Sequence, residues 1–269
     1  MRDLFRSFER HGVDYLLIGG QATILYGASQ FTEDVDLWVR PTGEEILRFL
    51  RALADLDAQV YKLTPPVTPP FVRRGHGFHF MIPRVGDDLP TFIDLMGRPP
   101  RVGSFARARA RSRTLSPTWG GAVPTAAPED LADLKKTDRP DDYPIISRLA
   151  RLRLAEERLP TARTLTWALA NTFVVDDLEA IIRAHGDAIP PSVAADDPAV
   201  SLLLACRARG REPTGRNVDR AAAILSRRAL ELQRLGRAYW RPVRDDLKAL
   251  RAAGVLIRVG TPVRELLPP

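Results

Sequence analysis

The chain has 269 residues, of which 45% are hydrophobic and 27% are charged, an ordinary composition for a globular protein with a sizeable core. No run of eighteen apolar residues predicts a transmembrane helix, and the charged first residues are unlike a signal peptide, so we expect a cytoplasmic protein with no membrane partner. The single cysteine, Cys206, excludes an intrachain disulfide framework, and the formal net charge of +7 is compatible with a nucleic-acid partner.

The N-terminal residues predict a helix followed by a strand–helix–strand arrangement. The helix covers 3–11 and precedes an apolar strand, Val13–Ile18. Gly19-Gly20 then turn the chain into a short helix, Gln21–Tyr26. The second strand, Asp34–Val39, alternates acidic and apolar residues at its start, which is typical of a strand with one polar face.

Two acidic residues follow the glycine turn. Thirteen residues separate Gly20 from Asp34, and Asp36 follows two positions later. Strand residues i and i+2 point to the same face, so both carboxylates share a face while their apolar neighbours face a core. Two carboxylates this close repel each other unless a cation lies between them. The pattern indicates phosphoryl-group transfer from a nucleotide; the alternative is a solvated strand end.

This pattern resembles the signature of the nucleotidyltransferase superfamily, whose best-known member is DNA polymerase β. The signature is a hydrophobic residue, Gly, then Gly or Ser, a gap of nine to thirteen residues, and Asp-x-Asp or Asp-x-Glu within a strand. Here Ile18-Gly19-Gly20 and Asp34-Val35-Asp36 match it. The chain is most similar to small bacterial and archaeal members, which include the toxins of abortive-infection toxin–antitoxin pairs.

The resemblance implies a metal-dependent nucleotidyltransferase that moves a nucleoside monophosphate from an NTP to a hydroxyl of RNA, for example tRNA, or of a protein. Asp34 and Asp36 would be catalytic and would hold two Mg²⁺ (or Mn²⁺) ions. Members of the superfamily take a third catalytic, metal-binding carboxylate from a neighbouring strand, and the only good candidate is Asp94 in the predicted strand Thr91–Met96. A charged residue inside an apolar strand is costly unless it is paired or metal-bound, which favours this role. The alternative is that Asp94 is an ordinary residue of an edge strand or a turn.

The resemblance places the nucleotide at the glycine turn. Gly19 and Gly20 would let a triphosphate approach the backbone at the start of the helix, where amide groups favour anions. Gln21 and Thr23 would add side-chain hydrogen bonds to it. Many strand-to-helix turns need glycine for conformational reasons alone, so the two glycines by themselves are weak evidence for nucleotide binding. The evidence is their sequence distance from the carboxylate pair, which matches the signature.

The middle of the chain predicts one helix and four strands. His79, in the expected strand Gly77–Pro83, either lines the site opposite the carboxylates or is an ordinary residue of the sheet face. The expected elements are a helix that begins at Pro41-Thr42, an extended loop over Thr64–Pro70, strands Gly77–Pro83 and Thr91–Met96 with a polar turn around Asp87-Asp88, and a short hairpin over 114–126.

A helix predicted from Pro128 through Lys136 is followed by an Arg-x-x-Asp element, Arg139 to Asp142. This block resembles the second signature of the family, a Leu-x-x-x-Lys helix followed by Arg-x-x-Asp. In the toxin relatives the Lys and Asp of this region help to hold the nucleotide, so the resemblance makes Lys135 and Asp142 nucleotide-binding residues. On a continuous helix Lys135, rather than Lys136, borders the buried face. The alternative is that both lysines are surface cations and the helix has a structural role only.

The C-terminal half predicts helices only, apart from a loop over Gly186–Pro198 and a helix-to-strand extension over Gly254–Leu267. The expected fold is α/β, with a nucleotidyltransferase-type short mixed sheet flanked by helices in residues 1–145 and a C-terminal all-helical domain in residues 146–269. The expected helices of that domain include Leu165–Asn171, Leu178–Arg183, Val200–Arg207 and Arg216–Leu235.

Two alternatives stay open. One is a non-catalytic nucleotide- or RNA-binding module with the same fold, which is favoured by Gln30 and Ile145 because relatives carry a cation and an aspartate there. The other is a toxin–antitoxin component whose helical half binds a cognate antitoxin-type protein. The basic composition does not decide between them, because an arginine-rich chain with only four lysines is also what a GC-rich genome produces.

Overall fold

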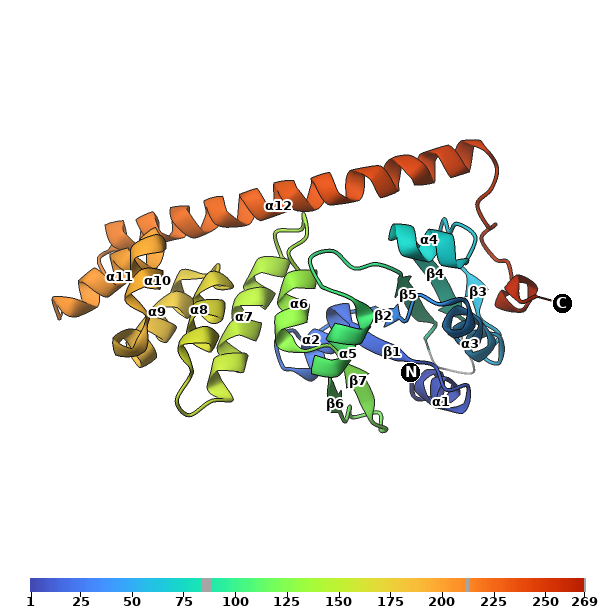
Figure 1. Cartoon of the computed structure of the whole chain (residues 1–269), viewed down its shortest axis with the longest axis horizontal. Coiled ribbons are helices and arrows are strands. Elements are labelled where there is room, and N and C mark those ends of the chain that lie inside the picture. Colours follow the sequence, from blue (N-terminus) through green and yellow to red (C-terminus); the bar gives the residue numbers. More distant parts are fainter. Residues whose placement is uncertain (84–88, 211–212, 269) are drawn as a thin grey trace. The chain divides into compact units, whose positions relative to one another are not determined.

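The computed structural model describes residues 1–83, 89–210 and 213–268 (Figure 1). The chain divides into two compact units. The first comprises residues 1–25, 29–134 and 239–269, and the second comprises 26–28 and 135–238. The sequence placed all of 146–269 in one C-terminal domain, whereas the structure groups its last segment with the N-terminal unit. No helix of the described residues is long and apolar enough to cross a membrane.

A seven-stranded mixed sheet organises the first unit, with the strand order β3-β4-β5-β2-β1-β7-β6. The β2–β5 and β1–β7 pairs are parallel, and the other pairs are antiparallel. The predicted α/β class, mixed sheet and helical C-terminal part are therefore confirmed. The strands are β1 (Tyr15–Ile18), β2 (Asp34–Val39), β3 (Gln59–Val60), β4 (Gly77–Ile82), β5 (Thr91–Met96), β6 (Arg113–Leu115) and β7 (Val123–Thr125).

The middle strand of the sheet, β2, has one apolar face and one acidic face. Leu37 lies in register with Leu95 of β5, and both are buried. One residue earlier, on the opposite face, Asp36 lies in register with Asp94, and Asp94 is in turn the register partner of His79 on β4. The strict alternation of a strand thus separates a hydrophobic row from a polar row that crosses three strands.

Two helices, α1 and α3, contribute aromatic residues to the hydrophobic core. The Phe8 ring of α1 lies 5.6 Å from that of Phe49 on α3, and the Phe49 ring lies 5.8 Å from Phe80 of β4. The side chain of Thr42 accepts a hydrogen bond from the Glu45 amide and starts α3. The helices of this part are α1 (Arg2–Arg10), α2 (Gly19–Leu25), α3 (Gly43–Ala54), α4 (Pro69–Arg74), α5 (Phe105–Arg111) and α6 (Pro128–Leu134).

The C-terminal segment joins the first unit by hydrogen bonding to the edge of the sheet. The Val60 amide donates to the Thr261 carbonyl at 2.9 Å, and the Gly260 amide donates to the Val60 carbonyl at 2.7 Å. The Val263 amide donates to the Ala58 carbonyl at 2.8 Å, and the Val263 side chain is fully buried. The backbone groups of the edge strand β3 are therefore satisfied by residues two hundred positions away, which no local pattern predicts.

The second unit is helical, and its core consists of aliphatic side chains from several helices. Core residues include Leu154, Leu165, Leu169, Leu178, Val200, Leu203 and Leu225. The helices are α7 (Asp142–Ala155), α8 (Ala162–Ala170), α9 (Val175–His185), α10 (Pro191–Asp196), α11 (Pro198–Ala208) and the part of α12 (Gly215–Ala252) up to Ala238, with one 3₁₀ turn, η1 (Gly186–Ala188). The last helix continues well beyond the predicted Leu235 and past Pro242.

Two loops predicted from sequence were wrong in part. The stretch Gly186–Pro198 contains η1 and α10, and Thr64–Pro70 ends in the start of α4. Both short helices begin with prolines, which suit the first helical positions because no amide donor is needed there. In the sequence alone the same prolines are typical of loop residues. The predicted polar turn at Asp87-Asp88 lies outside the described residues.

Candidate active site

The sheet brings the predicted carboxylates together. Asp34 and Asp36 lie on β2, and Asp94 is the direct register partner of Asp36 on the parallel strand β5. All three side chains are partly exposed. Residues that are register partners on neighbouring strands point to the same face, so the three carboxylates share one face of the sheet. Their role as metal ligands stays a prediction.

The glycine turn lies directly beside Asp36. Gly19 has a positive φ of 64°, and a Cβ atom added there would lie 1.8 Å from Asp36 Oδ2. The Gly20 amide donates to the same oxygen at 3.3 Å, and a Cβ on Gly20 would lie 2.5 Å from Thr32 Oγ1. Both glycines therefore leave room for neighbouring side chains, and the first turn of α2 presents its amide to a carboxylate, as helix N-termini favour.

The two polar side chains that follow the glycines are buried. Thr23 is fully buried, and its hydroxyl donates to the Gly20 carbonyl at 2.8 Å and lies 2.9 Å from the Ser29 hydroxyl. Gln21 is also buried in the first turn of α2. The Thr23 hydroxyl thus holds the turn in shape, and its contact with a nucleotide stays a prediction, as does that of Gln21.

His79 contacts the third carboxylate. Its Nδ1 lies 2.8 Å from Asp94 Oδ1, and both side chains are about a quarter exposed, at 26% and 23%. The backbone amide of His79 donates to the Thr64 hydroxyl at 3.1 Å. Of the two interpretations that the sequence left open for His79, the geometry therefore favours a residue of the site, because the imidazole and the carboxylate form a hydrogen-bonded pair.

Tyr61 and Lys62 lie close to the carboxylates, and the sequence analysis did not identify them. The Lys62 ammonium lies 4.5 Å from the centre of the Tyr61 ring, and that ring packs 4.8 Å from Phe92 of β5 and 6.2 Å from His79. One signal was present in the sequence, since Lys62 is one of only four lysines in a chain with 40 basic residues. The two-residue strand β3 that positions it is too short to predict.

The charges of these groups act on one another. Burial, followed by the charge of Asp94, raises the pKa of the Asp34 carboxyl above its ordinary value, and Lys62 offsets part of this effect. Burial opposes the charge on Lys62, but the Tyr61 hydroxyl and the carboxylates of Asp94 and Asp34 raise its pKa overall. The site is therefore an acidic cluster with one lysine, in which like charges crowd each other.

The donor set suits a hard divalent cation, because Mg²⁺ is bound by carboxylate oxygens and by the phosphates of its substrate. As the side chains stand, the described residues form no group of three or more His, Cys, Asp or Glu that could hold a metal ion. Asp94 is turned to His79, and Asp36 Oδ2 is turned to the Gly20 amide. The residue types fit a metal, and binding one would require these carboxylates to exchange their present partners.

The predicted pair Lys135 and Asp142 belongs to the second unit. The Lys135 ammonium donates to Asp142 Oδ1 at 2.8 Å, and the Thr137 hydroxyl donates to Asp142 Oδ2 at 2.5 Å. The prediction of a helix through Lys136 was wrong, because α6 ends at Leu134. The helical argument for Lys135 over Lys136 therefore does not apply. Nucleotide binding by Lys135 and Asp142 stays a prediction, and the geometry gives the pair a structural role at the start of α7.

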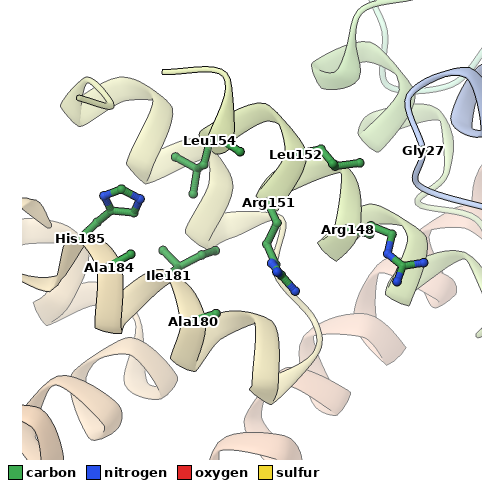
Figure 2. Close-up of a pocket in the computed structure, with 10 residues that line it drawn as sticks. Gly27, Arg148, Arg151, Leu152, Leu154, Ala180, Ile181, Ala184 and His185 are labelled. Carbon is green, nitrogen blue, oxygen red and sulfur yellow. The ribbon is translucent and has the colours of Figure 1, made fainter. Parts of the chain in front are cut away.

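The second unit has a groove of about 360 Å³ between α7 and α9. Figure 2 shows residues of α7, including Arg151 and Leu154, facing residues of α9, including Ile181 and His185. Arg151 is held by Asp177 at 2.7 Å. The described residues that line the groove include no carboxylate and no hydroxyl, so it lacks the ligands and nucleophiles that the sheet carries. The acidic face of β2 and β5 is therefore the candidate active site.

No protein-family model matches the chain, and no curated protein matches it. Any functional assignment therefore depends on the chemistry of the residues themselves.

The contact between Gly19 and Asp36 predicts a specific effect of Gly19→Ala. The new methyl group would overlap the Asp36 carboxylate, whereas Gly12→Ala introduces the same positive-φ strain with no atom within 4 Å of the new Cβ. Gly12→Ala should cost about 1–2 kcal/mol of unfolding free energy from backbone strain alone. Gly19→Ala should cost clearly more, as measured by urea denaturation.

The double variant Gly19→Ala/Asp36→Ala isolates the contact. Removing the carboxylate should recover part of the loss that exceeds the Gly12→Ala value, because Oδ2 and Cγ of Asp36 are gone while its Cβ, 2.5 Å from the added atom, remains. Additive effects of the two substitutions would contradict the proposed packing of Asp36 on the glycine turn.

The raised pKa of Asp34 predicts a pH-dependent gain in stability for Asp34→Asn. The folded state holds the Asp34 proton more tightly than the unfolded chain does, so stability falls as pH rises from about 4, the ordinary aspartate pKa, through the folded-state pKa. Asparagine does not ionise, so the stability of the variant does not fall with pH for this reason. The variant should melt at a higher temperature than the wild type at pH 7 in EDTA, and the gain should vanish below about pH 4. A lower melting temperature at pH 7 would contradict the account.

Proposed function

We propose that the protein is a metal-dependent nucleotidyltransferase that moves a nucleoside monophosphate from an NTP to a hydroxyl of RNA or protein. The observation that carries the proposal is the placement of Asp36 and Asp94 as register partners on neighbouring strands, with Asp34 on the same face and Gly19-Gly20 beside Asp36. This combination of a carboxylate cluster and a glycine turn is what the sequence motif predicts for nucleotidyl transfer.

The cofactor in this proposal is Mg²⁺ or Mn²⁺, which Asp34, Asp36 and Asp94 would hold. When bound, it would neutralise the triphosphate and stabilise the charge that develops on the attacking and leaving oxygens. Burial and, after it, the charge of Asp94 raise the pKa of Asp34, which supports this role because a cation between the carboxylates would relieve the repulsion.

The side chains of the site would accept the proton, orient the carboxylate and bind the phosphates during the transfer. The acceptor oxygen forms a bond to the α-phosphorus, the bond from that phosphorus to the bridging oxygen of pyrophosphate breaks, and the hydroxyl proton passes to the Asp94 carboxylate. His79 holds Asp94 Oδ1 at 2.8 Å and so fixes the orientation of that carboxylate. Lys62 supplies a positive charge beside the carboxylates and would bind the phosphates of the NTP.

The test is a transfer assay with each of the four NTPs labelled at the α-phosphate, incubated with Mg²⁺ and either total tRNA or a protein extract. The wild type should transfer label from at least one NTP to a macromolecule, and γ-labelled NTP should transfer none. Asp36→Asn should lower the rate by about 100-fold or more, because a charge-stabilising group worth several kcal/mol is lost. Asp3→Asn, at an exposed position on α1, is the matched control and should retain the wild-type rate.

The same assay tests the phosphate-binding role of Lys62. Lys62→Ala should raise the KM for the NTP by about tenfold or more, the value of one charge-assisted hydrogen bond. Lys248→Ala removes an exposed lysine that pairs with Asp245 and should leave KM unchanged. Transfer activity that survives Asp36→Asn in full would overturn the proposal.

A non-catalytic nucleotide-binding module is the second candidate. It is favoured by one observation, namely that the described side chains form no ready three-ligand metal group and that Asp94 is already paired with His79. This candidate predicts NTP binding by calorimetry that does not require a divalent metal, with no transfer of label to any acceptor, including water.

A further inference from the structure

The formal charge of the chain is concentrated on one helix. α12 contains ten of the 40 Lys and Arg residues but only four of the 33 Asp and Glu residues, so it carries +6 of the net charge of +7. The rest of the chain is almost neutral. A compositional bias towards arginine does not explain this, because such a bias would spread arginines over all exposed helices.

Four arginines in the part of α12 that belongs to the second unit form a line. We call Arg216, Arg220, Arg227 and Arg234 the arginine stripe; all four are exposed. At about 100° per residue they lie within about 40° of arc, and at about 1.5 Å per residue they extend over about 27 Å. The fully buried Ala221 and the buried Leu225 lie on the opposite side of the helix.

The arginines of the stripe are largely free to bind a partner. Within the described part of the chain, Arg220 and Arg227 have no carboxylate partner, and Arg227 donates only to the Ala223 carbonyl of its own helix. Arg234 pairs with Glu231, but both side chains are more than half exposed, and such surface pairs contribute little. Arg228 follows Arg227 in the chain and is not part of the stripe. Its guanidinium is already engaged, because it pairs with Asp197 and donates to the Leu169 carbonyl.

We propose that the arginine stripe binds the phosphate backbone of double-helical RNA. Guanidinium groups bind phosphates in a bidentate manner, and a line of about 27 Å faces many phosphates of a duplex. The segment 215–238 contains no aromatic residue on which an unpaired base could stack, which favours a duplex over a single strand. A line of four arginines, one of which pairs with the carboxylate of Glu231, also matches a polyphosphate better than the mixed charges of a protein surface.

The choice of RNA over DNA rests on the proposed function. Transfer of a nucleotide needs an acceptor hydroxyl, and each RNA nucleotide carries a 2′-hydroxyl, whereas duplex DNA offers hydroxyls at its ends only. The stripe therefore assigns RNA as the acceptor class, and binding by the stripe itself requires neither NTP nor metal.

The test measures binding by fluorescence anisotropy, without NTP or divalent metal, of a labelled RNA hairpin of about 20 base pairs, a duplex DNA of the same sequence and a single-stranded RNA. The wild type should bind the hairpin most tightly, with an affinity that falls steeply with salt, at a log–log slope of about −3 to −4 for four phosphate contacts. Arg220→Glu/Arg227→Glu should weaken binding at least tenfold and flatten the slope by about 1–2.

The matched control is Arg158→Glu/Arg163→Glu, which makes the same change in charge at two exposed arginines elsewhere in the second unit. It should bind RNA within about twofold of the wild type, and so should Asp34→Asn/Asp36→Asn, since the carboxylates serve transfer only. If charge reversal disturbs folding, as judged by thermal melting, Arg220→Gln/Arg227→Gln gives the same comparison.

Equal losses from the stripe and control variants would overturn the assignment of the surface, and tighter binding of duplex DNA or single-stranded RNA would overturn the assignment of the partner. Loss of transfer in Asp34→Asn/Asp36→Asn with intact RNA binding separates the two proposals, because only the proposed function predicts the loss. A stripe variant that binds RNA like the wild type would overturn this inference and leave the proposed function standing.

Discussion

Electrostatic repulsion among carboxylates on one face of a central strand is the constraint on which the site depends. β2 is the middle strand of seven, so its side chains are surrounded by neighbouring strands, and the alternation that buries Leu37 places Asp34 and Asp36 on the other face. The parallel neighbour adds Asp94 directly beside Asp36. Placing acids together stabilises no fold by itself. Burial is the larger cause of the raised pKa of Asp34, and the repulsion from Asp94 adds to it.

The surrounding residues can be understood as responses to this acidic face. Gly19 has no side chain where the Asp36 carboxylate lies, and the Gly20 amide donates to it. His79 Nδ1 is hydrogen-bonded to the Asp94 carboxylate, and Lys62, the only lysine among the first hundred residues, lies at the same cluster. Each contact satisfies part of the acidic charge. A divalent cation would neutralise more of this charge and would join the carboxylates to a triphosphate.

Local patterns in the sequence predicted the two strands that carry the carboxylates, but they predicted neither the position of Lys62 nor the end of α6. The strands of Asp34, Asp36 and Asp94 have their predicted bounds because alternation and the apolar flanks specify them. Lys62 was missed because its position depends on the two-residue strand β3 and on pairing with the distant C-terminal segment. The helix ends at Leu134, before the predicted Lys136, and Lys135 pairs with Asp142 at the start of α7, a contact that helix propensity does not contain.

The central claim is that Asp34, Asp36 and Asp94 form one cation site beside the glycine turn. The most direct measurement is a crystal structure with Mn²⁺ and a non-hydrolysable NTP analogue, using the anomalous scattering of the metal. The account predicts an anomalous peak within bonding distance of Asp34 and Asp36, about 2.0–2.2 Å, with the triphosphate next to Gly19-Gly20. No peak at these carboxylates at saturating metal, with Asp36 still turned to the Gly20 amide, would contradict it.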